Sequence, residues 1–459
     1  MTKTLSYRIA EFIYNLDLSD IPSDVQEKAK LLLLDTLGIM MATYDFIDVK
    51  RVINVAKLIS GDGRSTVIGH NYKTSPMSAA FANATMAHSV DYDDTHLGSV
   101  IHQSCIVIPT ALAVGEECGS SGEEILEAII GAYEVNARLG MVAPAKFHLR
   151  GFHPTSVVGV FGAALTASKL MGLSIEEMAN ALGLAGSMAA GVIQCIVEGV
   201  WVKPIHAGLG SFAGILAAYL AKEGCKGPRE IFEGKSGFFN TYMHGEELDF
   251  DAATRGLGET WETLNISIKP YPTCHATHSS IDAAREIREK YRLSPEDIKE
   301  FTCYVPKLTI DLVVEPWEEK INPSDPYGAK FSLPYTVIVA LKNGWVGLWD
   351  FTEEAIKNPD ILKHTPKVKG IWEKSYDRYG RTVLPAKAVV NTVDGKTYQV
   401  EVINHKGTPG NPMTKEEVIT KFMDNTKFSK YKDIGKELTD KVLNLEKYNV
   451  KDIAALLEK

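Results

Sequence analysis

The sequence predicts a mainly α protein in which a large all-helical domain, discontinuous in the chain, carries a smaller α+β lid domain. Helical periodicity runs to about residue 267, strand-like alternation follows, and helical periodicity returns after residue 402. The chain has 459 residues, which is enough for two or three domains. We therefore expect a helical domain of residues 1–267 and 403–459 and a lid domain of residues 268–402.

The N-terminal part carries the start signals and the apolar spacing of helices. Met1–Leu16 has apolar residues at helical spacing and should form an amphipathic first helix. Capping boxes are predicted at Ser23–Gln26, Ser121–Glu124 and Ser174–Glu177. Residues 156–171 and 177–192 are rich in glycine and alanine, which predicts helices whose backbones pack closely. A short strand is suggested over residues 65–69.

The C-terminal part mixes strand and helix signals. Phe301–Val305 alternates like a strand, and residues 389–402 form a predicted hairpin around an Asp-Gly turn. Ser294–Pro295 predicts a helix start. A capping box at Thr414–Glu417 opens a helical tail that we expect to pack against the N-terminal domain.

Composition excludes several classes of protein. The net charge is −9 with no basic stripe, which argues against nucleic acid as a partner. The six cysteines include no CxxC pair, which favours a reduced, cytoplasmic setting. The sequence contains no run of about 18 apolar residues, so we expect no membrane-spanning helix. The first helix carries an acidic residue and does not resemble a signal peptide.

The most unusual stretch is residues 87–102, which concentrates carboxylates and imidazoles in an apolar region. On a helix Asp91, Asp94 and Thr95 would share one face. Carboxylates there could orient a histidine or hold Mg²⁺, whereas an exposed acidic turn is the simplest alternative. The nearby His88, His96 and His102 weigh against that alternative.

Two later residues suggest partners for this stretch. His153 precedes Pro154 and a helix start, where the positive end of the helix keeps an imidazole neutral and able to act as a base. A lone histidine is more often structural. Lys203 has apolar neighbours, so its ammonium needs an anion, either a protein carboxylate or a substrate carboxylate.

A third segment lies at the predicted domain boundary, where ligands commonly bind. Lys269, His275 and His278 are expected in a proline-broken loop. His275 and His278 could ligate a metal, but two histidines without a third placed ligand are a weak zinc signal, and plain loop histidines are the alternative.

These segments resemble the MmgE/PrpD family, whose members dehydrate, decarboxylate or epimerise small polycarboxylates. The matching stretches are residues 88–95, 151–159, 203–208, 271–278, 330–335 and 411–414. The resemblance spans nearly the whole chain. It implies a helical domain with an α+β lid, a homodimer, and chemistry without a metal or organic cofactor.

The resemblance also implies site residues. In the family's cis-aconitate decarboxylases, the pocket is lined by the equivalents of Asp91, Thr95, His102, His153, Lys203, Lys269 and one histidine of the 275–278 segment, which we match to His278. One departure follows Pro306, where those enzymes place a pocket tyrosine and this chain has residues 307–310, Lys-Leu-Thr-Ile. That departure weighs against cis-aconitate decarboxylation.

We therefore expect a cofactor-independent, cytoplasmic, homodimeric lyase that binds a small di- or tricarboxylate and neither nucleic acid nor membrane. Dehydration like that of 2-methylcitrate dehydratase ranks first; epimerisation of a dicarboxylate such as iminodisuccinate, or decarboxylation, is the alternative. One of two histidines would remove a proton next to a carboxylate and the other would protonate the leaving group. The predicted catalytic residues are His102, His153, Lys203 and Asp91, and the predicted substrate-binding residues are Thr95, Lys269, His275 and His278, with no metal.

Two other classes of function fit parts of the pattern. Metal-dependent chemistry on an Asp-rich helix would need a second Asp-rich motif, which the sequence lacks. A carboxylate-binding protein without activity would need the lysines but not the histidines. The alternation of histidines and lysines over several segments favours an enzyme.

Overall fold

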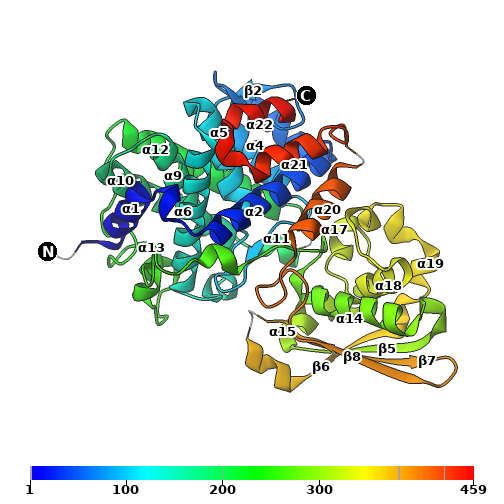
Figure 1. The fold of residues 1–459 in the computed structure, drawn as a ribbon. Helices are drawn as coiled ribbons and strands as arrows, with labels where there is room; N and C mark the ends of the chain where they lie inside the picture. The colour runs from blue at the N-terminus through cyan, green and yellow to red at the C-terminus, as the bar shows by residue number, and fades with distance from the viewer. Residues whose placement is uncertain (1–2, 199, 381–382, 428, 459) are drawn as a thin grey trace. The chain divides into compact units, whose positions relative to one another are not determined.

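The computed structural model describes residues 3–198, 200–380, 383–427 and 429–458. The chain forms two compact units, shown with the ribbon in Figure 1. Unit 1 comprises Met1–Ser89, Asp93–Ile268 and Thr414–Lys459, and unit 2 comprises Val90–Tyr92 and Lys269–Met413. The predicted mainly α architecture is confirmed.

Unit 2 extends beyond residue 402, where the sequence placed the end of the lid domain. The imidazole of His405 packs against the rings of His275 and His278, with centroid distances of 5.3 and 5.0 Å. The backbone N–H of Lys406 donates to Asp282 Oδ2 at 2.7 Å. These contacts hold the segment after the last strand within unit 2.

Unit 1 is built from helices. Its helices are α1 (Leu5–Asn15), α2 (Ser23–Thr43), α3 (Ile47–Leu58), α4 (Pro76–His88), α5 (Ser104–Cys118), α6 (Gly122–Met141), α7 (Lys146–Leu149), α8 (Pro154–Val157), α9 (Gly159–Leu170), α10 (Ile175–Gly186), α11 (Gln194–Val197), α12 (Lys203–Lys222), α13 (Phe238–Tyr242), α20 (Lys415–Thr426), α21 (Gly435–Leu443) and α22 (Val450–Leu457). Two antiparallel strand pairs complete it: β1 (Ser65–Thr66) with β2 (Lys73–Thr74), and β3 (Thr95–His96) with β4 (Ile266–Ser267). The short strand suggested near residue 65 is therefore present.

Helix α12 packs against α4, α9 and α10. A Cβ on Gly208 would lie 2.4 Å from Thr85 Oγ1 of α4, and a Cβ on Gly214 would lie 2.4 Å from the Cβ of Ala163 in α9. Only glycine allows these backbone approaches, so the close packing predicted for the small-residue helices is confirmed for α9.

Helix α12 also corrects one expectation. By length and hydropathy this helix could cross a membrane, although the sequence analysis found no such segment. In the structure 61% of its apolar window is buried inside the protein. Its apolar character is thus accounted for by contacts with α4, α9 and α10.

The predicted helix starts are partly confirmed. Capping boxes form at Ser121, Ser174 and Thr414. The box predicted at Ser23 is wrong, because α2 already includes Ser23 and the side chain of Gln26 donates to the carbonyl oxygens of two preceding residues.

Unit 2 contains a four-stranded sheet of order β6-β5-β7-β8, in which β6 is parallel to β5 and the other pairs are antiparallel. Its strands are β5 (Ile298–Val305), β6 (Val368–Trp372), β7 (Ala386–Thr392) and β8 (Thr397–Val402). Its helices are α14 (His275–Tyr291), α15 (Lys307–Thr309), α16 (Trp317–Ile321), α17 (Pro326–Ala329), α18 (Leu333–Asn343) and α19 (Pro359–Leu362). The hairpin predicted at residues 389–402 is confirmed as β7 and β8, and the turn glycine, Gly395, has φ +83°. The helix predicted at Ser294–Pro295 is wrong: a single 3₁₀ turn there leads directly into β5.

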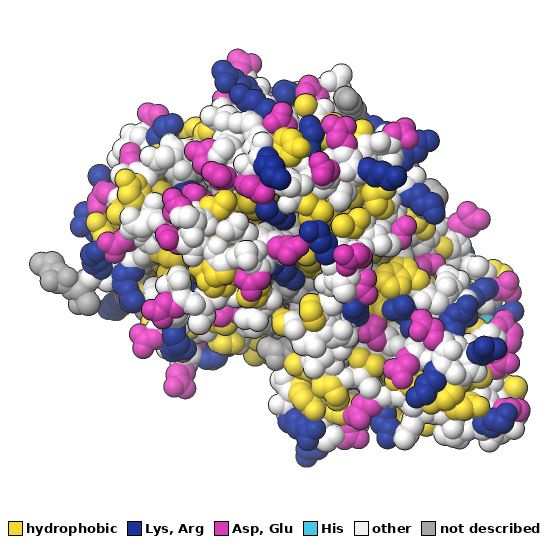
Figure 2. Space-filling model, in the orientation of Figure 1, with side chains coloured by type: hydrophobic (Ala, Val, Ile, Leu, Met, Phe, Trp, Pro, Cys, Tyr) yellow, Lys and Arg dark blue, Asp and Glu magenta, His cyan; other side chains and the backbone are white. Residues whose placement is uncertain are grey.

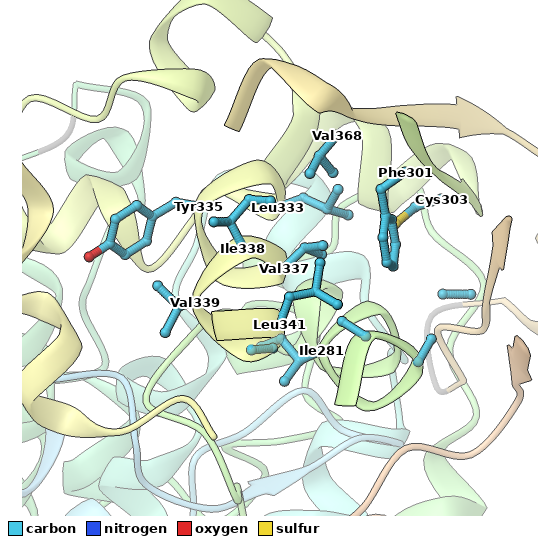
Figure 3. Packing of buried hydrophobic residues seen from close by; sticks show 14 of the residues in the cluster. Ile281, Phe301, Cys303, Leu333, Tyr335, Val337, Ile338, Val339, Leu341 and Val368 are labelled. Atoms are coloured by element: carbon cyan, nitrogen blue, oxygen red, sulfur yellow. The ribbon is translucent and has the colours of Figure 1, made fainter. Parts of the chain in front are cut away.

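The core of unit 2 fixes α14 and α18 against the sheet. Figure 3 shows Ile281 of α14 and Leu341 of α18 among the side chains that pack near Phe301 of β5 and Val368 of β6. All four side chains are fully buried. This packing positions the first turn of α14, where two predicted site residues lie.

The C-terminal tail packs on unit 1, where α20 and α21 contact α2 (Figure 1). Lys421 Nζ of α20 lies 2.7 Å from Asp35 Oδ1 of α2, and both side chains are 1% exposed. On the face shown in Figure 2, basic and acidic side chains are interspersed, so this face carries no basic stripe.

Candidate functional site

The acid-rich stretch that follows α4 is not helical. Helix α4 ends at His88, so the shared helix face predicted for Asp91, Asp94 and Thr95 is wrong. Asp91 has φ +54°, a left-handed conformation that aspartate tolerates better than most residues. The chain turns there, and Asp91 belongs to unit 2 whereas Thr95 belongs to unit 1.

In unit 1 the carboxylate of Asp93 joins two histidines. Asp93 Oδ2 lies 2.7 Å from His88 Nδ1 and 3.3 Å from His102 Nδ1. Burial opposes the ionised form of Asp93, but the two imidazoles hold the pKa of its carboxyl well below the usual range. A carboxylate on Nδ1 orients an imidazole and leaves its Nε2 for chemistry.

His102 is positioned by its neighbours as well. Thr95 Oγ1 lies 3.3 Å from His102 Nδ1, and the His102 backbone N–H donates to Thr155 Oγ1 at 3.1 Å. Asp94 accepts from the backbone N–H of Ser104 at the start of α5, at 3.1 Å. Burial, together with the charge of the adjacent Asp93, raises the pKa of Asp94 to about 7. Two neighbouring carboxyl groups thus have pKa values that are shifted in opposite directions.

His153 is the N-cap residue of α8, as predicted. Its Nδ1 lies 3.2 Å from His206 Nδ1, and its ring stacks on His88 with a centroid distance of 5.5 Å. Burial holds the pKa of His153 well below the usual range, and the charge of Lys203 adds to this effect. The imidazole is therefore neutral, chiefly because it is buried rather than because a helix begins beside it.

Lys203 and His206 lie in the first turn of α12. Lys203 is 7% exposed. Burial and the charge of Lys203 lower the pKa of His102 to about 4, and burial, His88 and Lys203 lower that of His206 to about 4. The first turn of α12 therefore places the buried ammonium of Lys203 near several neutral imidazoles.

In unit 2 the predicted residues Asp91 and Lys269 form an ion pair. Lys269 Nζ lies 3.1 Å from Asp91 Oδ2 and donates to the Asp91 carbonyl oxygen at 3.0 Å. Tyr92 donates its hydroxyl to the carbonyl oxygen of Pro270 at 3.1 Å. These bonds join the 90–92 segment to the chain that leads into α14.

His275 and His278 lie in the first turn of α14, so their predicted place in a loop is wrong. The last proline of this segment is Pro272, which leaves the chain free to become helical after Cys274. His278 is fully buried, and its Nε2 donates to the carbonyl oxygen of Thr273 at 3.2 Å. Burial holds the pKa of His278 well below the usual range, and His405 and Lys269 add to the shift.

A second buried lysine of unit 2, Lys330, was not among the predicted site residues. The Lys330 ammonium donates to the carbonyl oxygen of Pro272 at 3.0 Å. The backbone carbonyl oxygen of Lys330 accepts from the backbone N–H of Cys274 at 3.0 Å. Burial lowers the pKa of Lys330 to about 7. Lys330 thus fastens the segment that carries Lys269.

The structure gathers the predicted residues into two sets. Unit 1 brings together Thr95, His102, His153 and Lys203, and unit 2 brings together Asp91, Lys269, His275 and His278. The predicted site residues did not include the sites' other buried groups: His88, Asp93, His206, Lys330 and His405. Asp93 could have been predicted as a site residue because it lies in the acid-rich stretch, whereas no local sequence pattern indicates His405.

Among the described residues, two of the groups of side chains that have the donor atoms to hold a metal ion lie within a single unit. In unit 1, His88, Asp93 and Cys105 have donor atoms within 4.8 Å of one another, but burial raises the pKa of the Cys105 thiol well above its usual value, which disfavours thiolate ligation. In unit 2 the group consists of His275, His278 and His405.

The unit 1 cluster can transfer protons. His153 is a buried neutral base, His102 is held by a carboxylate that stabilises its charged form, and Lys203 supplies a positive charge nearby. Proton abstraction beside a carboxylate needs these three elements, because the intermediate gains negative charge in a water-poor site.

Comparisons with known proteins cover both units. The model of the MmgE/PrpD N-terminal domain matches residues 7–251, and the model of the MmgE/PrpD C-terminal domain matches residues 271–445. The chain is 27% identical to a cis-aconitate decarboxylase of Aspergillus terreus, over 98% of this chain and 94% of that protein. It is 27% identical to the cis-aconitate decarboxylase of Homo sapiens, over 97% and 92% of the two chains. It is 23% identical to a probable 2-methylcitrate dehydratase of Saccharomyces cerevisiae, over 77% and 70%.

Proposed function

Because this chain belongs to the MmgE/PrpD family, we propose that it is a lyase that acts on a small di- or tricarboxylate. The observation that carries this proposal is the cluster of His102, His153 and Lys203 in unit 1, with Asp93 behind His102. The names of the relatives, which align over 98% and 77% of this chain, support the same class of substrate.

In this proposal His153 is the base. Its buried imidazole is neutral, and it would remove a proton from the carbon next to a substrate carboxylate. The electron pair of the broken C–H bond moves onto that carboxylate, which becomes doubly negative. Lys203, the buried ammonium of the cluster, would bind the carboxylate and stabilise the added charge.

His102 is the acid in dehydration. Asp93 favours the charged form of His102, whereas burial opposes it, so this imidazole becomes protonated when the negative charges of the substrate arrive. It would give its proton to the leaving hydroxyl, the C–O bond breaks, and an alkene and water result. Thr95 contacts the ring of His102, and Thr155 accepts a hydrogen bond from the His102 backbone N–H.

Decarboxylation is the second candidate, and the comparisons favour it. The relatives named as cis-aconitate decarboxylases in Aspergillus terreus and Homo sapiens align over 98% and 97% of this chain. Loss of CO₂ leaves a similar carbanion, which a histidine would protonate. The absence of a tyrosine at residues 307–310 weighs against it. None of the relatives named above is an epimerase, so we do not put epimerisation forward.

Proton NMR in D₂O tests the proposal. The purified protein is incubated with 2-methylcitrate, citrate, cis-aconitate and iminodisuccinate in separate samples. A new alkene from a hydroxy acid establishes dehydration, and loss of CO₂ from cis-aconitate with a new C–D bond establishes decarboxylation. Deuterium next to a carboxylate without net elimination, or no change in any sample, overturns the proposed lyase.

The matched variants are His153→Ala and His364→Ala. Both remove a buried histidine, but His364 belongs to unit 2 and pairs with Glu296 at 3.3 Å. We expect His153→Ala to lower turnover by about 10²–10⁴-fold and His364→Ala to leave it within a few-fold of the wild type. Circular dichroism melting establishes that both variants are folded.

A further inference from the structure

Three histidine rings of unit 2 meet at the start of α14. The ring centroids lie 4.8 Å apart for His275 and His278, 5.3 Å for His275 and His405, and 5.0 Å for His278 and His405. One ring nitrogen of each residue lies within 4.8 Å of the other two. His275 and His278 come from one helical turn, and His405 comes from the segment after β8.

Hydrogen bonds to the backbone fix the tautomer of two of the rings. His278 Nε2 lies 3.2 Å from the carbonyl oxygen of Thr273, and His405 Nδ1 lies 2.9 Å from that of Lys406. A carbonyl oxygen only accepts, so these two nitrogens carry the protons. The lone pairs are therefore on His278 Nδ1 and His405 Nε2.

The lone pair of His278 has no hydrogen-bond donor. Among the described residues, His278 Nδ1 is buried and has no partner. A buried polar atom without a partner destabilises the folded protein, which suggests that a ligand binds His278 Nδ1. Histidines that ligate metals donate the other ring N–H to a backbone carbonyl or a carboxylate, which is the arrangement of both His278 and His405.

The local charge does not oppose a cation. Lys269 is the positive group that faces both His278 and His405, and Asp91 neutralises it at 3.1 Å. The carboxylate of Asp282 also faces His405. Lys330 adds a second ammonium near Lys269, but burial lowers its pKa to about 7.

We propose that His275, His278 and His405 bind a Zn²⁺ ion, which joins the segment after β8 to the first turn of α14. Three imidazole nitrogens suit zinc among the common divalent ions, with water in the fourth position. Zn–N bonds of about 2.1 Å place the nitrogens about 3.4 Å apart, so nitrogens at the widest allowed spacing of 4.8 Å need to approach by about 1.4 Å. The sequence alone offered two of these ligands, and the fold supplies the third.

The test is a titration of chelator-treated, full-length protein with Co²⁺, a spectroscopic probe for zinc sites. We expect one Co²⁺ per chain, with the visible absorption of a tetrahedral site, which Zn²⁺ then displaces. His405→Gln keeps a side chain that can bond the backbone but lacks the ligand nitrogen, and it should weaken binding by at least about 100-fold. His364→Gln, which changes a buried histidine elsewhere in unit 2, should bind like the wild type.

Melting curves give a second readout. Zn²⁺ should raise the melting temperature of the wild type and of His364→Gln, but not that of His405→Gln. No saturable binding in the wild type, or equal binding in His405→Gln and the wild type, overturns the proposal. Neither readout uses turnover, so the zinc site is tested independently of the proposed lyase activity.

Discussion

At the residue scale, one buried carboxylate organises the unit 1 cluster. Asp93 contacts His88 and His102 through the same oxygen, at 2.7 and 3.3 Å. From the sequence we expected Asp91 among the catalytic residues and a carboxylate of this stretch to orient a histidine; the described ion pair of Asp91 is with Lys269. The two acids lie two positions apart in the chain, yet Asp91 belongs to unit 2 with Lys269 and Asp93 belongs to unit 1 with His102.

Replacing this carboxylate by an amide should impair proton transfer. We expect Asp93→Asn to lower kcat by about 10²-fold or more, because an amide no longer stabilises a charged His102. The measurement is kcat against pH for the substrate that the NMR experiment identifies. Asp94→Asn is the neighbouring control and should keep most of the activity, since its amide oxygen still accepts from Ser104 N–H. Equal losses in the two variants would contradict the role given to Asp93.

At the scale of elements, the attachment of the tail depends on a buried ion pair. Lys421 of α20 and Asp35 of α2 are 2.7 Å apart and almost fully buried. The charge of Lys421 offsets part of the effect of burial, which raises the pKa of Asp35. The capping box at Thr414 begins α20, but this ion pair fixes the helix against its neighbour.

Removing one partner should destabilise unit 1 strongly. Lys421→Met leaves Asp35 buried without its cation and should reduce the free energy of unfolding by about 3–5 kcal/mol. Urea unfolding followed by circular dichroism measures the change. The double variant Asp35→Leu/Lys421→Met should recover most of the loss, because no charge then remains uncompensated at this contact. If the double variant is as unstable as the single variant, shape rather than charge holds the two helices together.

The element boundaries show where local signals suffice. The boxes at Ser121, Ser174 and Thr414 were predictable, because a cap is a contact between residues three apart. The start of α14 was not predictable, because its N-cap residue, Cys274, is not a typical capping residue and two prolines precede it closely. There the packing of α14 on the sheet decides the boundary.

At the scale of the whole molecule, buried histidines make stability depend on pH. Among the described residues, seven histidines have pKa values below the usual range: His70, His102, His153, His206, His278, His364 and His405. In each case burial is the largest cause. Between the lowered folded value and the unfolded value of about 6.5, the unfolded chain binds more protons, so the folded state loses stability as the pH falls.

Unfolding experiments should therefore show a loss of stability on the acid side. For His102, whose pKa falls to about 4, the contribution is on the order of 3 kcal/mol between pH 6.5 and 4. Asp94 acts in the opposite direction: its pKa is raised to about 7, so its protonation favours folding as the pH falls. The seven histidines with lowered pKa values outnumber the three carboxyl groups of the described residues whose pKa values are raised, Asp35, Asp94 and Asp350. Urea midpoints measured from pH 7 to pH 4 should fall, and His153→Gln should flatten the curve; a constant midpoint would contradict this balance.

The sequence by itself determined the helical class, the hairpin around Gly395, most of the helix caps and the candidate residues. Periodicity, turn chemistry and capping act over a few residues, so they can be recognised in the sequence. Acidic residues and histidines in an otherwise apolar stretch can likewise be recognised as candidate site residues. Only the tertiary structure decided the partners. The bonds from Asp93 to His102 and from Asp91 to Lys269, and the meeting of His405 with α14, depend on where the chain turns and which helices pack together. Those distances arise from long-range packing that no local pattern records.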